Sequence, residues 1–289
     1  MNGAEVQGPL SHNPPEALQT DLRPGGAARR VTLITGASGG IGADLARVFA
    51  RHGHDLALVA RSRLKLEALA AEISVTARPP LVLAVDLTAQ DSVSQIANDL
   101  EEAGAAPEIL VNNAGFGLAG EAAFLDPAGQ LELIDLNVRA AVEMTLRFLP
   151  AIRAARGKIL NVASTAGYFP GGPGMAAYYA SKAFLLSFSL ALHHELSRQG
   201  VTVSVLSPGY TKTGFQARAG FGPNIGLTRF PATPSMLVAE AGYAGLTAGR
   251  REIVPGFFNR LSLFLLPFLP RTLILSAISR VQQNRLSAT

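Results

Sequence analysis

The sequence predicts a doubly wound α/β fold, in which one mainly seven-stranded parallel sheet carries helices on both faces. Its 289 residues are 48% hydrophobic and only 16% charged, which suits one tightly packed, layered domain. Short apolar runs alternate along the chain with segments of helical periodicity. Each run is apolar almost throughout, as expected of strands that are buried on both sides.

The predicted strands are, in order, "VTLIT" from residue 31, "DLALVA" from 55, "LVLAVD" from 81, "EILVNNAG" from 108, "KILNVAS" from 158, "VTVSVLSPG" from 201 and "REIVPG" from 251. The segments between them have helical spacing. In the first, Ile41, Leu45, Val48 and Phe49 recur on one face, and Gly53 is placed to end the helix. Because the strands are parallel, a ligand is expected at their carboxyl ends.

The chain divides into three parts. Residues 1–30 are rich in Pro and Gly and have no apolar core of a signal peptide, which predicts a flexible tail that is neither secretion signal nor membrane anchor. Residues 31–256 carry the α/β pattern, and residues 257–289 form an apolar, helical C-terminal extension. Within the domain, residues 208–234 have no steady period and are rich in Gly, Pro and Thr, which predicts a mobile loop over the site.

Composition excludes several classes of function. The net charge is +4, but the arginines are scattered and no basic run alternates with aromatics, so no nucleic-acid partner is expected. The absence of cysteine excludes disulfides and is compatible with a reducing cytoplasm, the default location. His193 and His194 lack further ligands at suitable spacing, so no metal site is predicted.

The segment "TGASGGIG" joins the first strand to the first helix. Gly36, Gly40 and Gly42 permit a tight turn, close approach of a pyrophosphate and packing of the helix on the strand. The free N–H groups at the helix N-terminus attract an anion. This turn, in the first βα unit of an alternating chain, predicts a dinucleotide site.

A second segment, "AAYYASKAF" at 176–184, places two tyrosines ahead of a lysine. On a helix, both Tyr178 and Tyr179 share a face with Lys182, because residues three and four apart are neighbours. Periodicity therefore does not decide which tyrosine is the functional one.

Together, "TGASGGIG", "NNAG" and "YYASK" in this order resemble the short-chain dehydrogenase/reductase family, with its Rossmann-type fold, from about Val31 to about Pro255. The family pattern YxxxK falls on Tyr178 and Lys182. The resemblance implies that Tyr178 is the acid/base and that Lys182 lowers the tyrosine pKa and holds the nicotinamide ribose. It also implies that Ser164 fixes the substrate carbonyl oxygen and that Asn137 binds a water in a proton relay. Thr165 would restore the usual spacing to the tyrosine, whereas the "SxxG" pattern favours Ser164.

The resemblance implies a set of cofactor contacts. They are Gly36, Ser38, Gly40, Ile41 and Gly42; Asp86 and Leu87; Asn112, Ala114 and Gly115; Tyr178 and Lys182; and Pro208, Gly209 and Thr213. Asn113 is as well explained by a structural role.

Cofactor choice depends on the end of the second strand. An acidic residue there would bind the ribose 2′-hydroxyl of NAD, whereas this chain has Arg61, whose guanidinium suits a 2′-phosphate. NADP(H) is therefore favoured over NAD, although Gly39 stands where many NADP-preferring relatives carry a basic residue.

The tail at 257–280 is apolar but interrupted by Arg260, Pro267, Pro270 and Arg271, which argues against a membrane span. It could form a wall of the substrate pocket, a subunit interface, or a segment lying on a membrane in a peripherally associated protein. Each alternative is compatible with a hydrophobic substrate.

The sequence thus predicts an NADP(H)-dependent oxidoreductase that interconverts a hydrophobic carbonyl compound and a secondary alcohol. The family resemblance further implies a homodimer or homotetramer. The alternative is a non-catalytic protein that binds NADP and reports redox state to a partner.

Overall fold

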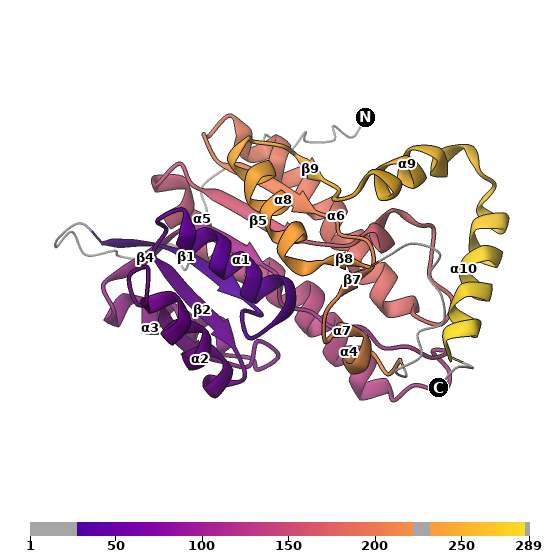
Figure 1. Ribbon diagram of the computed structural model, residues 1–289, viewed down its shortest axis with the longest axis horizontal. Helices are drawn as coiled ribbons and strands as arrows, with labels where there is room; N and C mark the ends of the chain where they lie inside the picture. The colour runs from indigo at the N-terminus through magenta and orange to yellow at the C-terminus, as the bar shows by residue number, and fades with distance from the viewer. Residues whose placement is uncertain (1–27, 222–231, 287–289) are drawn as a thin grey trace, which may run out of the picture.

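The computed structural model describes residues 28–221 and 232–286, and it has the predicted Rossmann-type architecture (Figure 1). A parallel sheet of seven strands runs in the order β3-β2-β1-β4-β5-β6-β9. These strands are β1 (Arg29–Thr35), β2 (Leu56–Ala60), β3 (Leu81–Ala84), β4 (Ala105–Asn112), β5 (Lys158–Val162), β6 (Thr202–Leu206) and β9 (Glu252–Ile253). Strand order reverses beside β1, which pairs with both β2 and β4, so the crevice of a doubly wound sheet lies there.

Helices cover both faces of the sheet. One core contains α1 (Gly40–Arg51), α2 (Arg63–Ser74) and α8 (Ser235–Thr247). The other contains α3 (Ser92–Glu102), α5 (Ala140–Ala154) and α6 (Ala176–Ser197). Neighbouring residues of β1 serve the two cores in turn, with Leu33 in the second and Ile34 in the first, which explains why adjacent residues of the strand are both apolar and buried.

Shorter elements connect these layers. They are α4 (Pro127–Ile134), a π-helical turn η2 (Asp135–Arg139), a 3₁₀ turn η3 (Thr165–Tyr168), α7 (Phe215–Arg218), and β7 (Thr211–Lys212) paired with β8 (Thr233–Pro234). After β9 the chain forms α9 (Phe257–Leu265), the 3₁₀ turn η4 (Leu266–Phe268) and α10 (Arg271–Leu286). Figure 1 shows α9 and α10 at the edge of the molecule, beyond the helices that cover the sheet.

Two predicted boundaries can be compared with the structure. The first helix ends as expected, because Gly53 follows it with a φ of 80° that favours glycine. The first strand starts earlier than predicted: Arg29 and Arg30 already pair with Ala105 and Ala106 of β4. The domain therefore reaches into the predicted 1–30 tail, whose first 27 residues lie outside the described part of the chain.

A buried polar network ties the sheet to the helices that carry the site. The side-chain nitrogen of Asn112 donates to Asn161 Oδ1 at 2.9 Å and to Thr145 Oγ1 at 3.0 Å. Asn161 in turn donates to Ser189 Oγ on α6 at 2.8 Å. Since unpaired polar groups in a core are costly, these bonds fix α6 relative to β4 and β5.

Candidate active site

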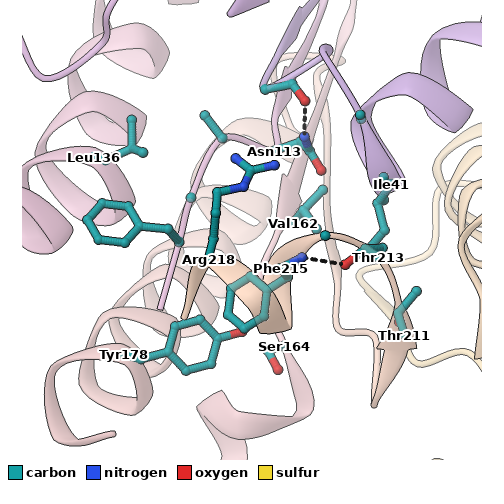
Figure 2. Close-up of a pocket in the computed structure, with 18 of the residues that line it drawn as sticks. Ile41, Asn113, Leu136, Val162, Ser164, Tyr178, Thr211, Thr213, Phe215 and Arg218 are labelled. Carbon is teal, nitrogen blue, oxygen red and sulfur yellow. Dashed lines mark hydrogen bonds between the residues drawn. The ribbon is translucent and has the colours of Figure 1, made fainter. Parts of the chain in front are cut away.

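A cavity of about 810 Å³ opens at the carboxyl ends of the strands, where the fold predicts a ligand. Segments that follow β1, β2, β3, β4, β5 and β6 line it, together with α6 and Gln282 of α10. Figure 2 shows its inner part, where side chains from α1, α6 and α7 converge. One cavity thus joins the glycine-rich turn to three of the four predicted catalytic residues, Ser164, Tyr178 and Lys182.

The glycine-rich turn forms a cradle that larger residues would fill. Gly36 and Gly40 have φ values of 66° and 55°, which side chains disfavour. A Cβ at Gly42 would collide with the carbonyl oxygen of Gly36 and with the amide of Asn113. Helix α1 begins at Gly40, so its free N–H groups face the cavity. These residues therefore fit the pyrophosphate of a dinucleotide.

Ser164 and Tyr178 meet at the inner end of the cavity. Ser164 follows β5 and caps η3, where its Oγ accepts a hydrogen bond from the Ala166 N–H at 3.1 Å. Figure 2 shows the Tyr178 oxygen directed at Ser164, whose side chain acts to lower the pKa of the tyrosine. Of the two alternatives in the sequence, Ser164 is thus the one that faces the Tyr178 hydroxyl.

Lys182 lies one turn further along α6, with its side chain almost fully buried. Its Nζ donates to the Val162 carbonyl at the end of β5 at 3.0 Å and lies 5.9 Å from the centre of the Tyr178 ring. Burial lowers the pKa of Lys182 to about 8. The ammonium is therefore held rigidly and can exchange a proton near neutral pH.

The Tyr178 pKa differs from the expectation. Lys182 was predicted to lower it below its ordinary value near 10, but burial raises the pKa of Tyr178 to about 12. The nearby Ser164 side chain opposes this shift without cancelling it. The ring is enclosed by apolar neighbours, among them Phe215 at 5.3 Å between ring centres, and a phenolate is poorly solvated there. At neutral pH Tyr178 is thus a proton donor.

Asn137 lies in the π-helical turn between α4 and α5, a feature frequent at functional sites. Its amide bonds to both backbone groups of Phe116, at 3.0 and 2.9 Å, and donates to Ser181 Oγ at 3.1 Å. A Cβ at Gly115 would lie 2.8 Å from Asn137 Oδ1 and 3.4 Å from Lys182 Nζ. The Asn137 side chain thus joins the strand end to α6 beside Lys182, and it does not line the cavity.

Of the two adjacent asparagines, only Asn113 lines the cavity, whereas Asn112 was the one predicted to contact the cofactor. Asn112 was expected to contact the cofactor, but its side chain is buried in the polar network under the helices and is not part of the cavity wall. Asn113 lines the cavity and donates to the Thr35 carbonyl at 2.9 Å, which fixes the glycine-rich turn. Successive strand residues point to opposite faces, so only one of the pair can face the crevice.

The remaining predicted cofactor residues all line this cavity. They are Gly36, Ser38, Gly40, Ile41, Gly42, Arg61, Asp86, Leu87, Ala114, Gly115, Pro208, Gly209 and Thr213. Thr213 packs against the turn, since a Cβ at Gly40 would lie 3.2 Å from its methyl group. Its Oγ1 also accepts from the Phe215 N–H at 3.2 Å, the bond dashed in Figure 2.

The end of β2 carries more positive charge than Arg61 alone. Lys65, one turn into α2, also lines the cavity, and sequence reasoning missed it because it belongs to no motif. Arg61 is largely exposed and makes only long ion pairs, 3.9 Å to Asp86 and 3.8 Å to Glu132. By contrast, Arg63 pairs with Glu67 and is outside the cavity.

Other cavity residues also escaped sequence reasoning. Figure 2 shows the Arg218 guanidinium of α7 extending towards Asn113. Of the three phenylalanines in the segment 208–234, Phe215 and Phe221 line the cavity, and Phe230 lies outside the described residues. Met175, Phe169 and Tyr179 extend this apolar wall. No local pattern marks these positions, because tertiary packing alone brings them together.

Gln282 of α10 closes the cavity from the C-terminal side. It is 3% exposed, and its Oε1 has no hydrogen-bond partner among the described residues. Ile274 on the same helix is also buried, and Leu275 packs near Gly171. The sequence left three alternatives for the tail, a pocket wall, a subunit interface or a membrane segment. Helix α10 forms part of the cavity wall, as the first alternative expects. A buried amide oxygen without a donor suits a ligand that brings one.

A parallel Rossmann-type sheet with a glycine cradle and a Ser-Tyr-Lys group defines a dinucleotide-dependent oxidoreductase. Residues 30–221 match the family model described as short chain dehydrogenase. The chain belongs to the short-chain dehydrogenase/reductase family, as its motifs indicated.

Named relatives agree with this assignment. The chain is 37% identical to sulfoacetaldehyde reductase 2 of Chromohalobacter salexigens over 64% of its own length and 74% of that protein. It is similar to a short-chain dehydrogenase from Sphingobium yanoikuyae in complex with NADPH, with 32% identity and a TM-score of 0.70 over 83% of this chain and 96% of that one. It is also similar to 3-ketoacyl-(acyl-carrier-protein) reductase from Brucella melitensis complexed with NADH, with 28% identity and a TM-score of 0.68 over 78% of this chain and 96% of that one. Relatives therefore bind either cofactor.

Proposed function

We propose that this protein is an NADP(H)-dependent oxidoreductase that interconverts a hydrophobic carbonyl compound and the corresponding secondary alcohol. The observation that carries the proposal is the placement of Ser164 and Tyr178 together, beside the buried Lys182, in the cavity that contains the glycine cradle. A non-catalytic cofactor-binding protein would have no use for a buried ammonium next to this partly buried phenol, because an ammonium is costly to desolvate.

Each residue has a role in the reductive direction. The bound nicotinamide cofactor supplies the hydride to the carbonyl carbon. Ser164 and Tyr178 hold the carbonyl oxygen by hydrogen bonds, and Tyr178 donates its proton as negative charge develops on that oxygen. Lys182 returns a proton towards Tyr178, and Asn137 keeps the strand end in place beside the ammonium. The raised pKa of Tyr178 keeps the phenol protonated at neutral pH, which is the form that donates a proton in this direction.

Charge around the cavity supports an anionic cofactor with an additional phosphate. Four basic residues line the wall, Arg61, Lys65, Lys182 and Arg218, against the two carboxylates of Asp86 and Glu132. Arg61 and Lys65 lie at the end of β2, where a doubly wound fold places the adenosine ribose. A 2′-phosphate there would form charge-assisted hydrogen bonds with both side chains.

Replacing Arg61 and Lys65 by alanine is expected to weaken NADPH binding by about tenfold for each charge removed, because each contributes roughly 1.4 kcal/mol of charge-assisted bonding. NADH binding, which lacks the 2′-phosphate, should change little. Titration calorimetry with both cofactors measures the ratio. Arg63→Ala is the matched control, since Arg63 faces Glu67 outside the cavity. An unmodified protein that prefers NADH would refute the cofactor assignment.

The substrate side of the cavity is apolar, with one polar exception. Phe169, Met175 and Phe221 form a wall that suits a hydrocarbon skeleton. Gln282 presents a buried carbonyl oxygen without a partner among the described residues. We infer a substrate that is mainly hydrophobic and carries a hydrogen-bond donor, such as a hydroxyl or an amide N–H.

Gln282→Leu is expected to raise KM about tenfold for ketones that carry such a donor, because the donor would then be buried unpaired at a cost of roughly 1–3 kcal/mol. KM for a pure hydrocarbon ketone of equal size should stay the same or fall. Cofactor affinity, measured by fluorescence titration, should not change. Gln282→Glu retains an acceptor and should keep the preference for donor-bearing ketones. Equal effects of Gln282→Leu on both kinds of ketone would contradict the role.

A further inference from the structure

The outward face of α9 and η4 is apolar. Phe257, Phe264 and Phe268 are 73%, 69% and 75% exposed, and Leu265 and Leu269 are about half exposed. With Phe258 and Leu261, these residues recur at the spacing of one helical face. We call these seven residues the α9 face. A helix on the surface of a protein in water normally presents polar residues there.

The register of α9 is fixed by its other face. Asn259 donates to the Pro255 carbonyl at 2.7 Å and packs against Gly209, where a Cβ would collide with its amide. Leu263 and Leu266 are half-buried on the same side. The exposed phenylalanines therefore cannot turn inward without breaking these contacts, and exposure of apolar side chains is built into the fold.

Charge near the α9 face has one sign. From Ile253 to the end of the chain there are four arginines, Arg260, Arg271, Arg280 and Arg285, and no aspartate or glutamate. Arg260 and Arg271 are exposed at either end of the face. A two-fold interface between two copies would bring these like charges together without a carboxylate from this segment to pair them. An apolar face edged by arginine instead matches an anionic lipid surface.

We propose that the α9 face is a peripheral docking surface for anionic phospholipid bilayers. Its phenylalanines and leucines enter the boundary between headgroups and acyl chains, and Arg260 and Arg271 pair with lipid phosphates. The nine residues of α9 span only about 14 Å, so the helix lies in the plane of the surface. In the part of the chain that the structure describes, no helix has the length and hydrophobicity needed to span a bilayer.

The docking surface is close to the substrate cavity along the chain. Helix α10 follows directly after η4, and it contributes Gln282 to the cavity wall. Docking would therefore attach to the bilayer the segment that leads into this cavity-lining helix, and a hydrophobic carbonyl compound accumulates in the bilayer. This consequence rests on the proposed function, whereas the docking itself does not.

Flotation of the full-length protein with lipid vesicles tests the proposal. The vesicles contain either phosphatidylcholine alone or phosphatidylcholine with 30% phosphatidylglycerol. We expect flotation with the anionic vesicles, weaker flotation with neutral ones, and partial release by 0.5 M salt because screening weakens the arginine contacts. The variant Phe257→Ser/Phe264→Ser/Phe268→Ser should bind anionic vesicles at least tenfold more weakly and keep its NADPH affinity.

Matched controls separate docking from general stickiness and from misfolding. Val75→Ser/Phe124→Ser removes two apolar side chains that are more than 80% exposed elsewhere on the surface, and it should float like the unmodified protein. Melting temperatures show whether each variant is folded. Equal flotation of the α9-face variant and the control, or no flotation of the unmodified protein, would overturn the proposal. Concentration-dependent dimers that need the α9 face, without vesicle binding, would instead identify a second copy as its occupant.

Discussion

Tyr178→Phe is expected to lower the turnover number for carbonyl reduction by about 10³-fold or more, within the range of general acid catalysis. The change removes only the hydroxyl that donates the proton and that faces Ser164. Packing of the ring on Phe215 and the glycine cradle are unaffected, so NADPH affinity should change less than about threefold, or ~0.6 kcal/mol.

Tyr179→Phe is the matched control for this change. The centre of the Tyr179 ring lies 6.2 Å from that of Tyr178. The Tyr179 side chain also lines the cavity and packs against Gly172. Loss of the Tyr179 hydroxyl should alter KM and leave most of the turnover. Single-turnover mixing of enzyme with NADPH and ketone measures the hydride-transfer step directly. Retained turnover in Tyr178→Phe, or its loss in Tyr179→Phe alone, would contradict the assignment.

Lys182→Met should lower turnover by about 10²-fold, because the variant can no longer resupply protons to Tyr178. In the unmodified enzyme, reduction should slow above about pH 8, because Lys182, whose pKa is lowered to about 8, loses its proton there. The variant should lack this decline. The turnover number of the unmodified enzyme and of Lys182→Met, measured between pH 6 and 10, tests this difference.

The same substitution has a consequence for stability with a defined sign. Burial lowers the Lys182 pKa from 10.5 to about 8, so between these values the folded chain binds fewer protons than the unfolded one. Burying the charge thus destabilises the fold below pH 8, and this cost disappears towards pH 10.5. From pH 7 to 10, the unmodified protein should gain roughly 2 kcal/mol of unfolding free energy relative to Lys182→Met. A difference independent of pH, in denaturant titrations, would argue against a buried charged lysine.

Local patterns predicted the layered fold because each strand and helix carries its own period. The adjacent residues Leu33 and Ile34 serve opposite cores, so both positions of the strand had to be apolar. Where a strand begins also depends on the neighbouring strand with which it pairs, which local sequence does not show. Strand β1 begins as early as Arg29 because Arg29 pairs with Ala105 of β4. The glycine cradle was predictable because a backbone with positive φ, packed closely against neighbouring backbone, leaves few alternatives to glycine.

The roles of individual polar residues were harder to predict. Neighbouring asparagines look alike in the sequence, and only the strand register shows that Asn113, not Asn112, faces the crevice. The sign of the Tyr178 pKa shift depends on how deeply the ring is enclosed, which spacing does not reveal. Gln282 lies a hundred residues beyond the catalytic tyrosine, and only the packing of α10 brings it to the cavity.

Isotope transfer tests the central claim most directly. The protein is incubated with a hydrophobic ketone and NADPH that carries deuterium at the transferred position of the nicotinamide ring, and the product is analysed by mass spectrometry. The account predicts a secondary alcohol with one deuterium on the carbinol carbon, formed by the unmodified protein and not by Tyr178→Phe. Tight binding of NADPH without label transfer, across ketones of graded size and polarity, would contradict it and favour a cofactor-binding sensor.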